Sequence, residues 1–371
     1  MSYILAEALN FVRRGISHLN YWGASHSLSA DNYWESNFQG FPRLLSDSSK
    51  APSTIRTVQV LEDDVDDIAI QYNKIVRGPL DYLLAIPGKD IRSKLIDSFN
   101  IWLQLPEEKL SIVKDIINLL HTASLLIDDI QDASRLRRGK PVAHDVYGVA
   151  QTINSANYAY YLQQARLKEI GDPRAFEIFT RSLLDLHLGQ GMDLYWRDMV
   201  VCPTEEEYTR MVMYKTGGLF NLALDLMRIQ SRKNTDFSKL VELLGVIFQI
   251  RDDYMNLQSG LYAEKKGLME DLTEGKFSYP IIHSIRASPE SSELLDILKQ
   301  RTEDEAVKIR AVKIMESTGS FQYTRETLSR LSAEARGYVK KLETSLGPNP
   351  GIHKILDLLE VEYPTNEKGR V

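Results

Sequence analysis

Residues 125–140 read Leu-Leu-Ile-Asp-Asp-Ile-Gln-Asp-Ala-Ser-Arg-Leu-Arg-Arg-Gly-Lys. Three carboxylates, Asp128, Asp129 and Asp132, stand at positions i, i+1 and i+4, and the basic pair Arg137 and Arg138 follows them. On a helix Asp128 and Asp132 share one face, so the carboxylates repel one another unless a cation lies between them. Magnesium suits such a site, because it takes a few carboxylate oxygens and completes its octahedron with water and phosphate. The alternative is a solvated acidic helix end.

The segment before these carboxylates has the pattern of a buried helix. Pro106 stands at the expected first helical position, and two glutamates follow it in the first turn. Apolar residues cover most of the circumference up to Asp132, but one stripe, which includes His121, is polar. Buried polar groups must be hydrogen-bonded, paired or coordinating, so this stripe predicts an internal polar cavity. His121 is either a core histidine with satisfied hydrogen bonds or a ligand-binding residue.

Length and composition indicate one large globular domain. Of the 371 residues, 43% are hydrophobic and 26% are charged, and no Pro/Gly/Ser-rich linker divides the chain after about residue 60. We therefore predict an all-α domain over residues 61–371, because apolar residues recur at three- and four-residue intervals. Residues 1–60 are richer in Ser, Asn and Asp and are predicted to be an extension. It either packs on the domain, covers an entrance or stays mobile.

Several classes of protein are disfavoured. The net charge of −6 argues against nucleic acid as a partner. A single cysteine, Cys202, excludes an intrachain disulfide and a Cys-rich zinc site, which fits an intracellular, reducing compartment. We found no apolar run near the ~20 residues that cross a bilayer and no secretory signal, so we expect no integral membrane association.

A second acidic motif stands on another apolar segment, about residues 239–257. Gln249, Asp252, Asp253 and Asn256 follow at i, i+3, i+4 and i+7, which places them on one helix face. Two acidic helices with nearby cations describe a cavity that binds a diphosphate through metal ions on both walls. Such a site stabilises a departing diphosphate, and an apolar pocket that excludes water protects the carbocation left behind.

Two further segments carry cations beside helix-breaking residues. Lys89 and Arg92 follow Pro87 and Gly88 near a predicted helix start, where free N–H groups attract phosphate. The alternative is a plain corner between helices. In residues 214–218, a lysine and a threonine precede two glycines, which indicates either a phosphate contact or a helix interruption where another helix packs closely.

With these motifs the chain resembles the trans-isoprenyl diphosphate synthases, and among them the geranylgeranyl diphosphate synthases of fungi and animals. The resemblance spans about residues 81–364. Residues 128–132 look like the first aspartate-rich motif and residues 252–256 like the second, which ends in Asn in this subgroup. It implies the isoprenoid synthase fold, a bundle of about ten or more helices around a central cavity. The implied activity is magnesium-dependent condensation of isopentenyl diphosphate with dimethylallyl, geranyl or farnesyl diphosphate, carried out by a homodimer.

The resemblance also implies a role for each site residue. Asp128, Asp132 and Asp252 would bind three magnesium ions, with Asp129 and Asp253 in support. Arg137, Lys215, Lys266 and Lys276 would hold the allylic diphosphate, with Thr216 and Gln249 near the reacting carbons. Lys89, Arg92, His121 and Arg138 would hold isopentenyl diphosphate.

The residues that precede the first motif predict the length of the product. Ser124 and Ala123 lie roughly 6 to 7.5 Å down the helix from Asp128, in line with a growing tail. Both are small, whereas family members that stop at C15 resemble one another in carrying bulky aromatics there. We therefore expect a C20 product, with Tyr160, Tyr161 and His187 as candidates for a deeper floor.

Three other functions share part of this sequence pattern. A farnesyl diphosphate synthase usually has Gln and Gly where His121 and Pro87 stand. A terpene cyclase normally carries a different second motif, and a non-catalytic prenyl-synthase-like subunit does not need intact motifs. The last residues, Gly369-Arg370-Val371, look like a degenerate peroxisomal address, without which we expect a cytoplasmic location.

Overall fold

The computed structural model describes residues 67–88, 90–233, 235–258 and 269–361, all within the unit Val58–Val371. The predicted extension, residues 1–60, and the C-terminal tripeptide lie outside these described residues. The same holds for Lys89 and Lys266, so their roles stay predictions. The boundary at residue 60 also stays a prediction.

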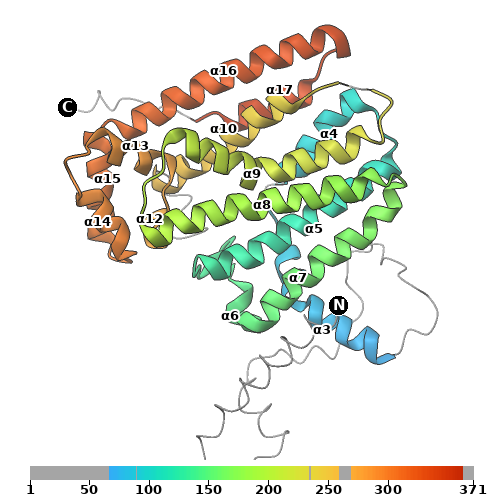
Figure 1. Cartoon of the computed structure of the whole chain (residues 1–371), viewed down its shortest axis with the longest axis horizontal. Coiled ribbons are helices and arrows are strands. Elements are labelled where there is room, and N and C mark those ends of the chain that lie inside the picture. The colour runs from blue at the N-terminus through green and yellow to red at the C-terminus, as the bar shows by residue number, and fades with distance from the viewer. Residues whose placement is uncertain (1–66, 89, 234, 259–268, 362–371) are drawn as a thin grey trace, which may run out of the picture. The chain divides into compact units, whose positions relative to one another are not determined.

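Helices make up almost all of the described chain, which confirms the predicted all-α class (Figure 1). In chain order they are α3 (Asp67–Leu84), α4 (Ile91–Leu103), α5 (Glu107–Gln131), α6 (Ala143–Tyr147), α7 (Val149–Arg166), the 3-10 helix η1 (Leu167–Ile170), α8 (Arg174–Met199), α9 (Glu205–Arg228), α10 (Ser238–Gln258), α12 (Glu270–Glu274), α13 (Tyr279–Ala287), α14 (Glu293–Gln300), α15 (Glu305–Ser317), α16 (Ser320–Leu346) and α17 (Pro350–Leu359).

One short hairpin interrupts the helices. Strands β1 (Leu136–Arg137) and β2 (Lys140–Pro141) pair antiparallel. The two residues between them have positive φ, 55° at Arg138 and 75° at Gly139, as the tightest hairpin turns require. This turn fixes where the basic pair after the first acidic motif points, which helical periodicity did not predict.

Both motif-bearing helices form close to their predicted bounds. Pro106 is the N-cap residue of α5, one position before its predicted place as the first helical residue, and Asp132 is the C-cap. The second motif lies on α10, which extends the predicted segment by one residue at each end. Figure 1 shows α16, α10, α9 and α8 crossing the molecule one after another, and α5 packs against α9 as well as α3, α4 and α7.

Glycines allow the central helices to approach closely. A Cβ atom on Gly189 of α8 would lie 2.6 Å from the backbone nitrogen of Lys215 in α9. On α10, a Cβ on Gly245 would lie 3.3 Å from the Cα of Gly217. Helix α9 continues unbroken through Gly217 and Gly218, so the predicted helix interruption is wrong, although other helices do pack closely against these glycines. Lys215 and Thr216 are thereby held between α8 and α10. A phosphate contact by this segment stays a prediction.

Helix α5 is long and apolar enough to cross a membrane, contrary to the expectation that no segment approaches that size. Half of its most apolar window is buried inside the structure. The buried core helix of a soluble protein meets the same criteria, so this finding is weak evidence for a membrane span. Helix α5 contacts α3, α4, α6, α7, α9 and η1, and these contacts cover part of its apolar surface.

Candidate active site

The two acidic helices share a common centre at Arg92. This arginine lies in the first turn of α4. Burial lowers the pKa of Arg92 to about 10, although Asp252 of α10 and Asp128 of α5 lie close enough to oppose this change. The two acidic motifs, predicted separately, therefore lie close to the same half-buried cation.

The first motif contains both engaged and unengaged carboxylates. Asp129 is fully buried and accepts hydrogen bonds from Arg137, one of them at 2.7 Å from Nε. Asp132 accepts from Nη1 of Arg197 at 2.9 Å. Asp128 makes no hydrogen bond or ion pair through its carboxylate with any described residue. Burial raises the pKa of Asp128, and the neighbouring carboxylates of Asp132 and Asp129 add to this effect while Lys215 opposes it.

In the second motif too, one aspartate is bonded to the protein and the other is not. Every acceptor position of Asp253 is used, because Oδ1 accepts from Gln249 and Lys276 while Oδ2 accepts from the Tyr208 hydroxyl and the Tyr279 backbone N–H. Asp252, one residue earlier, makes no such bond or ion pair within the described part of the chain. In each wall the first aspartate is therefore available to a ligand, and the second one is fixed by the protein.

Asp253 also orients the pair of residues predicted near the reacting carbons. A carboxylate only accepts, so the amide nitrogen of Gln249 must face Asp253, at 2.9 Å. The amide oxygen of Gln249 then faces Thr216 and accepts its hydroxyl proton at 2.7 Å. The hydroxyl oxygen of Thr216 keeps its lone pairs for another partner. The structure therefore brings Thr216 and Gln249 together, as predicted.

Arg92 and His121 form a second pair. Nη1 of Arg92 lies 2.9 Å from Nε2 of His121, and because a guanidinium only donates, Nε2 must be the unprotonated acceptor. Burial and the nearby arginines lower the pKa of His121 well below its usual value, which agrees with a neutral ring. His121 thus makes a specific hydrogen bond to a cation. A core histidine with satisfied hydrogen bonds and a ligand-binding residue would both show this bond, so the ligand-binding role of His121 stays a prediction.

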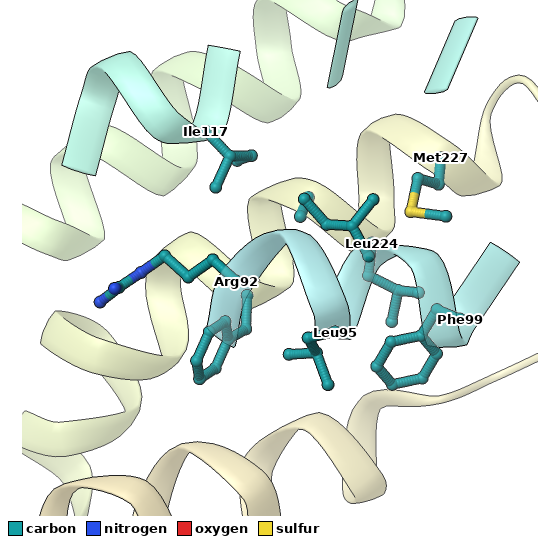
Figure 2. Close-up of a pocket in the computed structure, with 9 residues that line it drawn as sticks. Arg92, Leu95, Phe99, Ile117, Leu224 and Met227 are labelled. Atoms are coloured by element: carbon teal, nitrogen blue, oxygen red, sulfur yellow. The ribbon is translucent and has the colours of Figure 1, made fainter. Parts of the chain in front are cut away.

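The stem of Arg92 closes a small apolar cavity of about 10 Å³, room for about one water molecule. Its walls come from α4, α5 and α9 and include Leu95, Ile117 and Met227. Figure 2 shows the guanidinium pointing away from these apolar side chains. It lies 5.8 Å from the ring centre of Phe220, so aromatic contact also holds it.

The hairpin separates the two arginines of the basic pair. Arg137 turns back onto Asp129 of α5. Arg138 instead donates to the carbonyl oxygen of Ile86, and its guanidinium lies against Gly88, where an added Cβ would meet Nη2 at 3.0 Å. Arg138 is therefore beside the loop before α4, the helix that carries Arg92, while Arg137 stays with Asp129 of the first acidic motif.

Sequence reasoning missed the contribution of α8. Lys215 donates to Asp193 at 2.8 Å, Gln190 donates to Gln131 at 2.6 Å, and Arg197 binds Asp132. Burial acts to lower the pKa of Lys215. The carboxylates of Asp193, Asp128 and Asp132 raise this pKa by more, so the ammonium stays charged. The spacing of Gln190, Asp193 and Arg197, at i, i+3 and i+7, was the available signal of a polar helix face. Helix α8 therefore forms a third side of the site, in addition to α5 and α10.

The residues predicted to set product length separate into buried and exposed ones. Ala123 is fully buried in an apolar cluster with residues of α3 and α7, and Ser124 donates to the carbonyl oxygen of His121. Tyr160 is half-buried and packs against the same cluster. Tyr161 is 72% exposed and His187 is exposed too, so the prediction that they form an interior floor is wrong for the single chain. Consecutive helix residues point about 100° apart, which separates Tyr161 from Tyr160.

The carboxylates suit a cation that arrives with its phosphate ligand. Among the described residues no three His, Cys, Asp or Glu side chains form a ready metal cluster. Magnesium is usually bound by one or two carboxylates plus substrate phosphates, so a complete protein cage is not needed. The unengaged carboxylate of Asp128, crowded by Asp129 and Asp132, is the kind of ligand that a hard cation would stabilise. The residues present fit the metal that the resemblance implies.

Comparison with known proteins identifies the family of the chain. The polyprenyl synthetase family matches residues 73–315. Among curated proteins, the chain is 78% identical over 296 residues to geranylgeranyl pyrophosphate synthase janG of Penicillium janthinellum, covering 80% of this chain and 81% of that protein. It is 62% identical over 287 residues to geranylgeranyl pyrophosphate synthase penG of Penicillium crustosum (77% of this chain, 84% of that protein). It is 58% identical over 315 residues to geranylgeranyl pyrophosphate synthase spyE of Aspergillus fumigatus (85% of both). The chain therefore belongs to the polyprenyl synthetase family.

Proposed function

We propose that this protein is a geranylgeranyl diphosphate synthase, a prenyltransferase that condenses isopentenyl diphosphate with allylic diphosphates to a C20 product. The observation that carries the proposal is the pair of unengaged carboxylates, Asp128 and Asp252, which belong to two helices and both lie close enough to the half-buried Arg92 to raise its pKa. The relatives named above are geranylgeranyl pyrophosphate synthases, and this chain matches most of their length. This similarity supports the same activity.

In this proposal the cations on the described walls hold two diphosphates. Arg137, Lys215 and Lys276 bind the allylic diphosphate, and Arg92 and Arg138 bind isopentenyl diphosphate. Neutral His121 fixes Arg92 through its hydrogen bond, so the guanidinium is oriented before substrate enters. The binding groups are already ordered, which lowers the entropic cost of bringing the two substrates together.

The reaction needs no covalent intermediate with the protein. The allylic C–O bond breaks and its electron pair leaves with the diphosphate, after which the isopentenyl double bond attacks the allylic carbon and a proton passes to the diphosphate. Charged Lys215 and Lys276 stabilise the departing anion. Thr216, whose proton is held by Gln249, presents oxygen lone pairs toward the developing positive charge. Both effects lower the barrier by fixed electrostatics.

Magnesium is the cofactor in this proposal, held by Asp128, Asp132 and Asp252. When bound it supplies Lewis-acid neutralisation of the diphosphate, with three ions expected per site. The ions would also relieve the crowding of carboxylates that raises the pKa of Asp128. Asp129 and Asp253 support the site from behind, because protein donors occupy Oδ1 of Asp129 and both carboxylate oxygens of Asp253.

Replacing Ala123 by Phe is expected to shift the product from C20 to C15. Ala123 is fully buried between α5 and the helices α3 and α7, so a ring there must occupy the space that a growing tail would use. Product chain length, measured after incubation with labelled isopentenyl diphosphate, checks this. Thermal unfolding must be measured in parallel, since an oversized core side chain costs roughly 1–3 kcal/mol. A folded variant that still makes C20 alone contradicts this account of length control.

We also propose that the protein works as a homodimer through α7 and α8. Both helices expose apolar side chains in stripes, with Ile153 and Tyr161 on one and Leu184, Leu188 and Tyr195 on the other. An exposed apolar face of this kind marks an association surface, and in a two-fold dimer the same face serves both subunits. Sedimentation of the purified chain tests this, and a monomer at assay concentrations would refute it.

One assay tests the function as a whole. The purified chain is incubated with magnesium, isopentenyl diphosphate and each allylic diphosphate in turn, and the products are separated by chain length. C20 product supports the proposal, whereas C15 product alone indicates a farnesyl diphosphate synthase. Cyclic hydrocarbon indicates a terpene cyclase, and no turnover indicates a non-catalytic subunit.

A peroxisomal location is proposed from Gly369-Arg370-Val371, and an unchanged location after their removal would refute it.

A further inference from the structure

Arg197 lies behind the first acidic motif and joins two helix ends. It stands in the last turn of α8, and its side chain is only 10% exposed. Nη1 donates to Oδ1 of Asp132, the C-cap of α5, at 2.9 Å, and Nε lies 3.2 Å from Oδ1 of Asp198. A planar guanidinium can make both bonds at once, which a single ammonium on a flexible stem does less well.

The chain of ion pairs continues to the far side of the site. Asp198 also accepts from Arg301 at 2.9 Å, and Arg301 ends α14. The side chain of Arg301 lies against Gly275, where an added Cβ would meet Cγ at 3.1 Å. Gly275 directly precedes Lys276, the lysine bonded to Asp253. Arg197 is therefore the innermost link between the end of the first acidic motif and the loop that carries a substrate-binding lysine.

We propose that Arg197 is a positioning residue of the magnesium site, which fixes the Asp132 carboxylate through Oδ1 so that Oδ2 is left for the cation. The inference rests on the proposed function, in which Asp132 is a metal ligand. Groups that hydrogen-bond to metal ligands fix the orientation of those ligands and so raise metal affinity. Within the described part of the chain, Oδ2 of Asp132 has no hydrogen-bond partner, so the second oxygen remains available.

A cation so close to a metal site could instead compete for Asp132. The geometry favours positioning for two reasons. Arg197 shares its charge between Asp132 and Asp198, and it also lies near enough to Asp193 to lower the pKa of that carboxyl, so it is embedded among carboxylates rather than facing the site alone. The neighbouring Gln131 is tied to α8 through Gln190, so the end of α5 is anchored by two bonds.

Calorimetric titration of magnesium and inorganic diphosphate into the full chain tests this without turnover. Arg197→Gln is expected to weaken magnesium-dependent diphosphate binding roughly 10- to 100-fold, the usual effect of losing a group that orients a metal ligand. The diphosphate affinity of Arg197→Lys should lie between those of Arg197→Gln and the wild type. Lysine keeps the positive charge, but it bonds less well to both carboxylates, Asp132 and Asp198, at once. Arg174→Gln, at the exposed other end of α8, is the matched control and should bind as the wild type does.

Each outcome decides the question. Unchanged or tighter binding by folded Arg197→Gln overturns the positioning role, and tighter binding identifies competition. If circular dichroism shows that Arg197→Gln does not fold, Arg197→Lys decides instead, with weaker binding in support and wild-type binding against. If the wild type itself shows no magnesium-dependent diphosphate binding, the proposed function fails and this inference fails with it. Normal wild-type binding beside an unaffected Arg197→Gln removes this inference alone.

Discussion

Asp128→Ala and Asp252→Ala are each expected to lose turnover by at least about two orders of magnitude, the loss that follows removal of one group that stabilises developing charge. Neither variant should lose stability, because neither carboxylate bonds to a described residue of the protein. Removal of Asp128 is expected even to stabilise the metal-free chain. Its half-buried carboxylate lies near those of Asp132 and Asp129, and both the burial and these neighbouring charges disfavour its charged form in the folded state.

The sign of this effect gives a second measurement. The pKa of Asp128 is raised above the usual 3.8 in the folded protein, so the folded state holds a proton that the unfolded state has lost. Stability therefore falls as pH rises from about 3.8 through the raised pKa, and this contribution should be missing in Asp128→Ala. Chemical unfolding in metal-free buffer at several pH values checks it.

The matched control for this prediction is the next residue, Asp129→Ala. Asp129 is fully buried against Arg137, and breaking a buried pair by removing one partner costs about 3–5 kcal/mol. Loss of stability is therefore expected at Asp129 and loss of turnover without instability at Asp128. If Asp128→Ala keeps wild-type turnover, or if it unfolds as readily as Asp129→Ala, the assignment of Asp128 to the ligand is wrong.

The sequence predicted the features that depend on helical periodicity. Asp128 and Asp132 are one turn apart and so are Asp252 and Asn256, so each motif had to place its polar groups on one face of an apolar helix. The need to satisfy buried polar groups then predicted that the two faces meet. Helices α5 and α10 have nearly the expected bounds, and both acidic walls lie beside Arg92.

What remained unpredicted depends on contacts between helices far apart in the sequence. Periodicity shows that Gln190, Asp193 and Arg197 share a face, but it does not show that α8 turns this face to α5 and α9. The outward direction of Tyr161 depends likewise on which neighbours cover α7. The hairpin that separates Arg137 from Arg138 results from positive φ at two residues, one of which is not glycine. Pattern reasoning has little means of foreseeing that choice.

The second large effect is expected at Asp253. Asp253→Ala should lower the free energy of unfolding by about 3–5 kcal/mol, because it leaves the buried ammonium of Lys276 without its nearest carboxylate and the buried hydroxyl of Tyr208 without an acceptor. Turnover should fall as well. Without Asp253, nothing fixes the amide of Gln249 in the orientation that holds the proton of Thr216.

Tyr208→Phe separates these two effects. It removes one hydrogen bond to a charged acceptor, worth about 1.5–3 kcal/mol, and leaves Asp253 with Gln249, Lys276 and the Tyr279 backbone as donors. This variant should lose stability while keeping most of its turnover, because Gln249 and Lys276 remain fixed. Denaturant unfolding and steady-state kinetics on both variants, with Asp252→Ala alongside, measure the contrast. If Asp253→Ala proves as stable as Asp252→Ala, the division of each motif into one carboxylate for the ligand and one for the protein does not hold, and both aspartates of the second wall must then be treated as candidate metal ligands.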